Sequence, residues 1–151
     1  VIPNDAYMTG TIRTLKNETR AMVKERMETI VSTVAAAFRA EAKVVWGAGC
    51  PVLMHDADVY ADVKKALVTL DGVPSVDLDD MGMPMISMGS EDFAYVANKV
   101  PSVFLGVGAG EATDGVFYPQ HHPMVKFDEV ALPYGSALFA YTSINWLLEH
   151  R

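Results

Sequence analysis

The chain has 151 residues, and its 19 acidic and 12 basic side chains give a formal net charge of -7. Phosphate binding requires clustered Lys and Arg, so this charge argues against nucleic acid as a partner. Half of the residues are hydrophobic, which favours a buried core over disorder. The longest apolar runs fall well short of the roughly 20 residues that span a bilayer. With a single cysteine and therefore no internal disulfide, the composition predicts a globular, cytoplasmic protein without a membrane segment.

The first 48 or so residues have the pattern of a strand, a helix and a second strand. Alternation from Ala6 to Leu15 predicts a strand with one polar face. Asn17 can cap a helix whose apolar residues recur at the three- and four-residue spacing of one buried stripe. Alternation from Ala42 to Trp46 predicts the second strand, which Gly47 interrupts. The stripe of the helix consists of Val23, Met27, Ile30, Val31, Val34 and Phe38.

The remaining residues alternate between helical and strand patterns. Two glycines and a proline between Gly47 and Pro51 predict a domain boundary at about residue 50. Asp56 can cap a second helix that ends near Gly72. Residues 102–107 predict a strand buried on both faces, and a last long helix begins near Pro133. Together these elements indicate an α/β fold.

Two shorter segments lie between the second helix and the buried strand. Val76 to Leu78 has the character of a short strand in front of acidic residues. Met81 to Met88 contains four methionines and follows neither period, so it predicts a loop with an adaptable apolar surface. Its methionines either face a hydrophobic ligand or fill a gap in the core.

Gln120-His121-His122-Pro123 is the most suggestive local feature, because loops that follow strands are where α/β proteins bind their ligands. A neutral imidazole is a good ligand for zinc, manganese or cobalt. The structural alternative is that both rings are half-exposed loop residues bonded to the backbone. Either role is compatible with the motif alone.

Two further features could contact a ligand. Gly89 to Phe93 reads Gly-Ser-Glu-Asp-Phe, which is typical of a helix start with Ser90 as the cap and Glu91 and Asp92 at the positive end of the dipole. Such a helix end can also line a cleft. Arg13 lies on the polar face of the first strand, where a guanidinium suits bidentate capture of a carboxylate, or is simply solvated.

Several well-known motifs are absent, among them HExxH, paired Cys-x-x-Cys, the P-loop, GxSxG and the dinucleotide-binding glycine pattern. A metal site needs at least three protein ligands, whereas the sequence offers one convincing histidine cluster. A metal-dependent activity would therefore require further ligands from elsewhere.

Four motifs occur in a characteristic order: Val1-Ile2-Pro3, Gly10-Thr11-Ile12-Arg13-Thr14, Gly89-Ser90-Glu91-Asp92-Phe93 and His121-His122-Pro123, the last followed by Phe127-Asp128-Glu129 and Leu132-Pro133. In this the chain resembles the amidohydrolase branch of the dimetal aminoacylase and carboxypeptidase family. That branch includes hippurate hydrolase, N-acyl-amino-acid amidohydrolases and auxin-conjugate hydrolases. The resemblance spans nearly the whole chain.

The resemblance implies a two-domain enzyme of which this chain is the C-terminal portion. Residues 1–50 would be the second half of a ferredoxin-like αβ lid domain that forms a homodimer, and residues 51–151 the last part of an αβα catalytic domain. The missing N-terminal portion would supply most ligands of the two divalent metals, zinc, manganese or cobalt, and the glutamate that acts as general base.

The resemblance also implies roles for individual residues. The family pattern His-any-Pro places a metal ligand at His121 and leaves His122 in the variable middle place. The Arg of Gly-Thr-x-Arg maps to Arg13 and would hold the substrate carboxylate, while Glu91 and Asp92 would lie beside the metal cleft. Met54-His55-Asp56 departs from the Val-Asn-Asp that relatives commonly have.

The implied activity is hydrolysis of the amide bond of small N-acyl amino acids. Two alternatives stay open from the sequence. One is a non-catalytic association module, in which the unit at residues 1–50 offers a sheet edge to a partner. The other is a dipeptidase or an aminobenzoyl-glutamate hydrolase of the same family.

Overall fold

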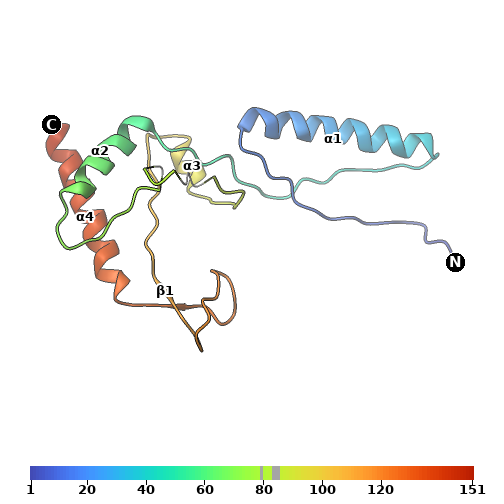
Figure 1. Ribbon diagram of the computed structural model, residues 1–151. Helices are drawn as coiled ribbons and strands as arrows, with labels where there is room; N and C mark the ends of the chain where they lie inside the picture. Colours follow the sequence, from blue (N-terminus) through green and yellow to red (C-terminus); the bar gives the residue numbers. More distant parts are fainter. Residues whose placement is uncertain (79, 83–85) are drawn as a thin grey trace. The chain divides into compact units, whose positions relative to one another are not determined.

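The structure is a computed structural model that describes residues 1–78, 80–82 and 86–151. The chain divides into two compact units (Figure 1). The first comprises Val1–Met54 and Ile86–Val100, and the second comprises His55–Met85 and Pro101–Arg151. Each unit is therefore built from segments that are distant in the sequence.

Helices dominate both units. The first unit contains α1 (Asn17–Ala37) and the four-residue α3 (Ala94–Ala97). The second contains α2 (Ala57–Val68), α4 (Ala131–Glu149) and the two short strands β1 (Gly110–Glu111) and β2 (Lys126–Phe127). The strands pair antiparallel, with Gly110 opposite Phe127 and Glu111 opposite Lys126. The mixture of helices and a small sheet agrees with the α/β class expected from the sequence at this coarse level.

Helix α1 confirms the first predicted helix, although it starts and packs differently from the expectation. Lys16 occupies the N-cap position, without a side-chain cap bond, and Asn17 is the first helical residue. The helix ends in a Schellman motif, because Arg39 has a φ of 58° and Ala40 N donates to Ala35 O at 2.9 Å. The stripe predicted to be buried is not, since α1 has no buried residue and Phe38 is 82% exposed.

The segment that follows α1 returns along the helix within the first unit (Figure 1). Trp46 Nε1 donates to Glu28 Oε1 at 2.6 Å, and Lys24 Nζ lies 4.9 Å from the centroid of the Trp46 ring. Arg20 Nη2 donates to Gly49 O at 3.3 Å. These side-chain contacts, rather than a ladder of backbone hydrogen bonds, hold the segment against the helix.

The four predicted strands are wrong in the part of the chain that the structure describes. Residues 6–15, 42–46, 76–78 and 102–107 are all outside helices and strands. The alternation of side chains is present in the first two, but a strand forms only where a neighbour accepts and donates its backbone hydrogen bonds. Met83 and Met85 of the predicted methionine loop lie outside the described residues.

Helices α2 and α4 pack against each other in the second unit. The predicted cap of α2 is confirmed, because Asp56 Oδ1 accepts from Asp58 N at 3.1 Å and Val59 N at 3.0 Å. Val63 of α2 and Leu138 of α4 are buried, each 8% exposed. Polar contacts add to the interface, including a Thr69 to Tyr141 hydroxyl contact of 3.0 Å.

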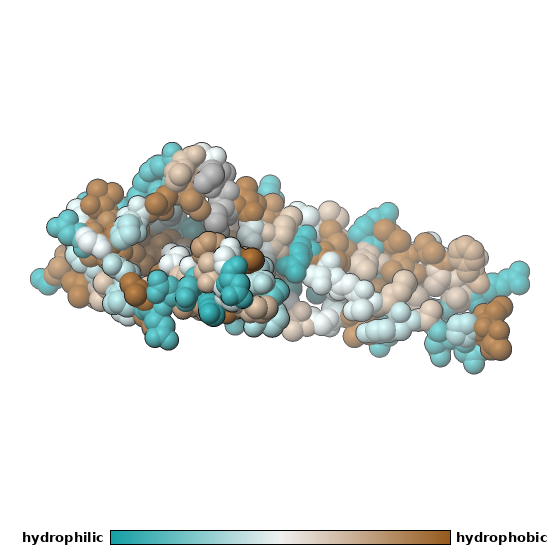
Figure 2. Space-filling model, turned by 60° about the horizontal axis from the view of Figure 1, so that its bottom comes forward, coloured by the Kyte–Doolittle hydropathy of each residue, from teal (hydrophilic) through white to brown (hydrophobic). Residues whose placement is uncertain are grey.

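Helix α4 is apolar around its whole circumference, which is typical of a helix covered on every side. Its face against α2 is covered, but Phe139, Leu132 and Leu147 are 71%, 67% and 61% exposed. Figure 2 shows hydrophobic residues spread among hydrophilic ones on the visible surface. None of the helices that the structure describes combines the length and the apolar character needed to cross a bilayer.

Candidate functional site

The histidine loop lies between β1 and β2. Thr113 and Val116 pair through two backbone hydrogen bonds of 2.9 and 3.0 Å, and Asp114 and Gly115 between them have φ values of 52° and 77°. Positive φ at both central residues is the mark of a type I′ turn, which favours Asp-Gly. This tight turn reverses the chain, so that the following residues fold back beside β1. Asp128 N donates to Ala109 O at 2.8 Å, and this hydrogen bond closes the base of the loop.

His121 lies in a turn with an unusual backbone conformation. Its φ is 73°, in the left-handed region that residues with a Cβ rarely adopt and in which His is enriched. His122 N donates to Pro119 O at 3.0 Å, so that His121 is the third residue of a four-residue turn. The side chain of His121 is exposed. The loop therefore presents this imidazole to its surroundings on a constrained backbone.

His122 is half-buried and differs from its neighbour in having its ring engaged. Met124 N donates to His122 Nδ1 at 3.1 Å. The ring also stacks on Tyr118, with centroids 4.4 Å apart and planes inclined by 17°. A neutral imidazole that accepts at Nδ1 carries its proton on Nε2, so it has no free lone pair for a metal. The His121 ring is exposed and has no such partner in the part of the chain that the structure describes.

Arg13 and the Gly89 to Phe93 segment are brought together in the first unit. Arg13 Nη1 donates to the carbonyl oxygen of Met88, the residue directly before Gly89. The other guanidinium N–H groups of the exposed Arg13 have no partner among the residues that the structure describes. The guanidinium is thus anchored at one end and open at the other.

Glu91 shapes the start of α3. Its Oε1 accepts from Phe93 N at 3.0 Å, and its carbonyl oxygen accepts from Ala94 N at 3.3 Å. Phe93 is the N-cap residue, without a side-chain cap bond, so the prediction that Ser90 caps this helix is wrong. The helix begins further along than the Ser-Glu-Asp pattern suggested. Asp92 is exposed, and its carbonyl oxygen accepts from Tyr95 N at 2.9 Å.

A network of amide side chains in the same unit was not foreseen. Asn17 Oδ1 accepts from Val52 N at 2.9 Å, and Asn98 Nδ2 donates to Val52 O at 2.9 Å. The two asparagines are joined by a bond of 3.2 Å from Asn17 Nδ2 to Asn98 Oδ1. Nearby, Tyr95 Oη donates to Gly49 O at 2.6 Å. The network links α1, residues 49–52 and α3, and therefore supports the segment that carries Glu91 and Asp92.

Two acidic residues after α2, Asp77 and Asp80, share one basic partner, Lys64. Lys64 Nζ lies 2.8 Å from Asp77 Oδ2 and 2.7 Å from Asp80 Oδ1, and Tyr60 Oη donates to Asp77 Oδ2 at 2.7 Å. These hydrogen bonds raise the pKa of the Lys64 ammonium. Over residues 1–78, 80–82 and 86–151, no three side chains of His, Cys, Asp and Glu form a group that could hold a metal ion.

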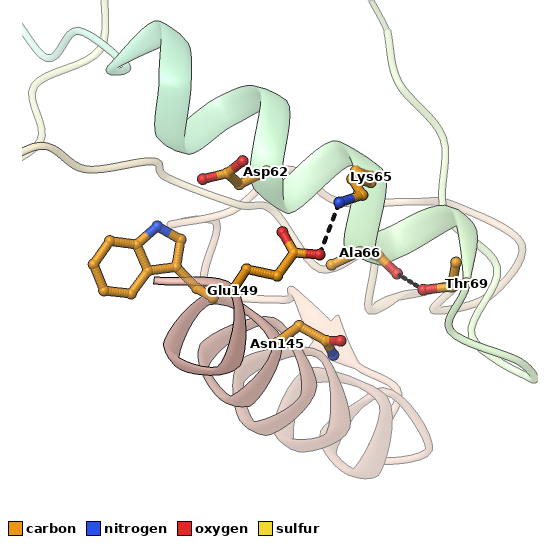
Figure 3. A pocket seen from close by; sticks show the side chains of 7 residues that line it. Asp62, Lys65, Ala66, Thr69, Asn145 and Glu149 are labelled. Atoms are coloured by element: carbon orange, nitrogen blue, oxygen red, sulfur yellow. Dashed lines mark hydrogen bonds and ion pairs between the residues drawn. The ribbon is translucent and has the colours of Figure 1, made fainter. Parts of the chain in front are cut away.

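A pocket lies between α2 and the last turns of α4, and Figure 3 shows it lined by Asp62 and Lys65 on one helix and Asn145 and Glu149 on the other. Lys65 Nζ donates to Glu149 Oε1 at 2.7 Å. This bond holds the pKa of Glu149 below its ordinary value of 4.5 and raises the pKa of Lys65 above its ordinary 10.5. None of the candidate site residues lines this pocket.

The Lys65 to Glu149 pair predicts a pH-dependent contribution to stability. A depressed carboxyl pKa contributes above about pH 4.5 and is lost as the pH falls through the folded-state value, whereas a raised ammonium pKa contributes below 10.5 and is lost at higher pH. Lys65→Met should therefore lower the free energy of unfolding slightly at pH 7 and by less at pH 3, because the contribution of the pair declines as the pH falls below 4.5. Urea unfolding followed by circular dichroism measures this. An equal difference at both pH values would contradict it.

Comparison with known proteins places the chain in a family. The model of peptidase family M20/M25/M40 matches residues 5–145, which is most of the sequence. The chain belongs to this family. The resemblance drawn from the motifs is therefore confirmed, and the M20/M25/M40 family is one of metal-dependent peptidases and amidohydrolases.

Individual relatives cover the chain but are much longer. N-acetyl-L-cysteine deacetylase of Bacillus subtilis (strain 168) is 33% identical over 99% of the chain and 33% of its own length. Thermostable carboxypeptidase 2 of Saccharolobus solfataricus is 29% identical over 97% and 35%. IAA-amino acid hydrolase ILR1-like 2 of Arabidopsis thaliana is 29% identical over 99% and 33%. The chain thus spans about a third of these relatives, and no solved structure matches it.

The four site residues predicted from the sequence fall in both units. Arg13, Glu91 and Asp92 lie in the first unit, and His121 lies in the second. The structure links Arg13 to the residue before Gly89 and leaves the His121 ring exposed. The His122 ring accepts from Met124 N and stacks on Tyr118, whereas the His121 ring has no such partner among the residues that the structure describes.

Proposed function

We propose that this chain is part of a metal-dependent hydrolase that cleaves the amide bond of N-acyl amino acids. The observation that carries the proposal is the family match over residues 5–145. Relatives named as an N-acetyl-L-cysteine deacetylase and an IAA-amino acid hydrolase favour an acylated amino acid as the substrate. One relative is named as a carboxypeptidase, so a dipeptidase, which also hydrolyses an amide bond, remains the alternative.

In this proposal His121 supplies one ligand to a site of two divalent metals, zinc, manganese or cobalt. The exposed ring on a constrained turn fits that role. The described residues do not fit a complete site, because none of them form a group of three possible ligands. The other ligands and the general base would then come from polypeptide beyond this chain, consistent with a span of about a third of the relatives. When bound, the metals would polarise the substrate carbonyl and activate water.

The residues of the first unit would bind the substrate. Arg13, open at one end of its guanidinium, would hold the substrate carboxylate, since a planar fork suits a carboxylate. Glu91 and Asp92, on the segment anchored by Arg13 and the asparagine network, would lie beside the substrate. Glu91 already bonds its own backbone, so its contribution is to shape this segment.

The same proposal assigns the two parts of the chain. Residues 1–50 form the second half of a lid domain that makes a homodimer, and residues 51–151 form the C-terminal part of the catalytic domain. The cell compartment proposed is the cytoplasm. A cysteine count of one is compatible with that compartment, because no internal disulfide is needed.

Comparing the isolated chain with a complete enzyme tests the proposal. With zinc, manganese or cobalt added, the purified 151-residue chain should show negligible hydrolysis of hippurate and N-acetyl amino acids, because a single imidazole does not retain a catalytic ion. A complete enzyme that contains this chain should hydrolyse them, lose activity with a chelator and regain it with the ions. Appreciable turnover by the isolated chain would contradict the partial site, and a metallated, complete enzyme without amidohydrolase activity would contradict the function.

A further inference from the structure

We infer that His122 is a positioning residue, whose ring holds the turn that presents His121 and is not itself a ligand. The inference rests on the proposed function insofar as His121 is taken to bind a metal. Its geometric part concerns the loop alone. Three groups of His122 are engaged in that loop: the backbone N–H, the backbone carbonyl and the imidazole.

The imidazole performs the task of an asparagine or aspartate side chain in an Asx turn. In such a turn a side-chain acceptor binds the backbone N–H two residues further on. Here His122 Nδ1 accepts from Met124 N at 3.1 Å. The residue between them, Pro123, has no N–H, so Met124 provides the first backbone donor after His122. The ring thereby fixes the chain on the C-terminal side of His121.

Two successive turns meet at His122. Its N–H closes the turn from Pro119 at 3.0 Å, and its carbonyl oxygen accepts from Val125 N at 3.0 Å and closes the next turn. His121 lies inside the first turn with a φ of 73°, a conformation that costs free energy in a residue with a Cβ and persists only when its surroundings hold it. His122 is the residue that joins the two turns and so maintains this conformation.

Stacking keeps the His122 ring in place. Tyr118 covers one ring face at a centroid distance of 4.4 Å, and both side chains are half-buried. For Nε2 to bind an ion, the ring would have to move its proton to Nδ1 and lose the Met124 bond. The two neighbouring histidines therefore have different roles: His122 supports the turn, and His121 is the candidate ligand.

Nitrogen NMR of the ¹⁵N-labelled chain tests the ring directly. At about pH 8, where histidines are ordinarily neutral, long-range ¹H–¹⁵N spectra should show His122 with its proton on Nε2 and an unprotonated Nδ1. A spectrum with the proton on Nδ1 of His122 would overturn the inference. The readout involves no metal, so it is independent of whether His121 binds an ion.

Two variants test the role of the acceptor. His122→Asn keeps a side-chain acceptor for Met124 N, whereas His122→Leu keeps bulk and removes the acceptor. Amide exchange of Met124 should be slow in the native chain and in His122→Asn, and about two- to tenfold faster in His122→Leu, as expected for one lost hydrogen bond. His121→Leu is the matched control and should leave this exchange unchanged. Equal exchange in all chains, or equal acceleration in the Asn and Leu variants, would overturn the inference.

Discussion

Replacing His121 with Ala in a complete enzyme that contains this chain should lower bound metal and reduce the rate of N-acyl amino acid hydrolysis by roughly a hundredfold or more. Loss of a partner that only orients a ligand already costs about 10- to 100-fold in metal affinity or activity, and loss of the ligand itself should cost at least as much. Elemental analysis of the dialysed protein and steady-state kinetics measure the two effects.

His150→Ala is a matched control for His121→Ala. His150 lies at the end of α4, with Nε2 3.4 Å from Asp62 Oδ2 and its ring stacked on Trp146, so its loss removes an imidazole from elsewhere in the chain. The control should retain metal and rate. A His121→Ala enzyme that is fully metallated and fully active would remove His121 from the site.

Arg13→Ala in a complete enzyme should raise KM for N-acyl amino acids about 10- to 100-fold, because a charge-assisted hydrogen bond contributes roughly 1.5–3 kcal/mol. The effect should be much smaller for substrates whose carboxylate is replaced by a carboxamide, since these lack the charge that the guanidinium binds. Arg13→Lys should recover only part of the affinity, because an ammonium lacks the planar fork. Kinetics with the paired substrates measure the difference.

A rise in KM of Arg13→Ala could also result from loss of the contact between Arg13 and Met88, without any contact to substrate. If the guanidinium only anchors the carbonyl oxygen of Met88, its removal should disturb both classes of substrate equally. An equal loss for the carboxylate and carboxamide substrates would therefore assign Arg13 a structural role. The substrate pair separates these roles, whereas the loss of activity alone does not.

Helices were predictable because their determinants are local. Asp56 precedes an amphipathic run, and its carboxylate caps α2 as expected, while Pro133 falls in the first turn of α4. The strand predictions failed because alternation describes only one side of a pairing. The segment 102–107 has the composition of a buried strand, yet it has no ladder among the described residues. The apolar composition of this segment indicates that it should be buried, but it does not indicate which element would cover it or pair with it.

The candidate site was predictable only in part, for a related reason. His121 and Arg13 were indicated by motif, but the sequence does not show which ring of an adjacent histidine pair is engaged. That depends on Tyr118 and on the N–H of Met124, which a turn brings to the ring. Asn17 was expected to cap a helix by its position, whereas it bonds a peptide 35 residues away. Such distant partners leave no local pattern.

The asparagine network provides hydrogen-bond partners for the backbone near the end of the first segment of the first unit. Buried or half-buried peptide groups usually need a helix or a sheet, since unmet donors and acceptors are costly away from water. At Val52 both backbone groups are met by Asn17 and Asn98 instead. At this residue two carboxamides thus make the hydrogen bonds that a neighbouring strand would otherwise make. We therefore expect the irregular connector to tolerate changes in its own side chains better than changes of Asn17 or Asn98.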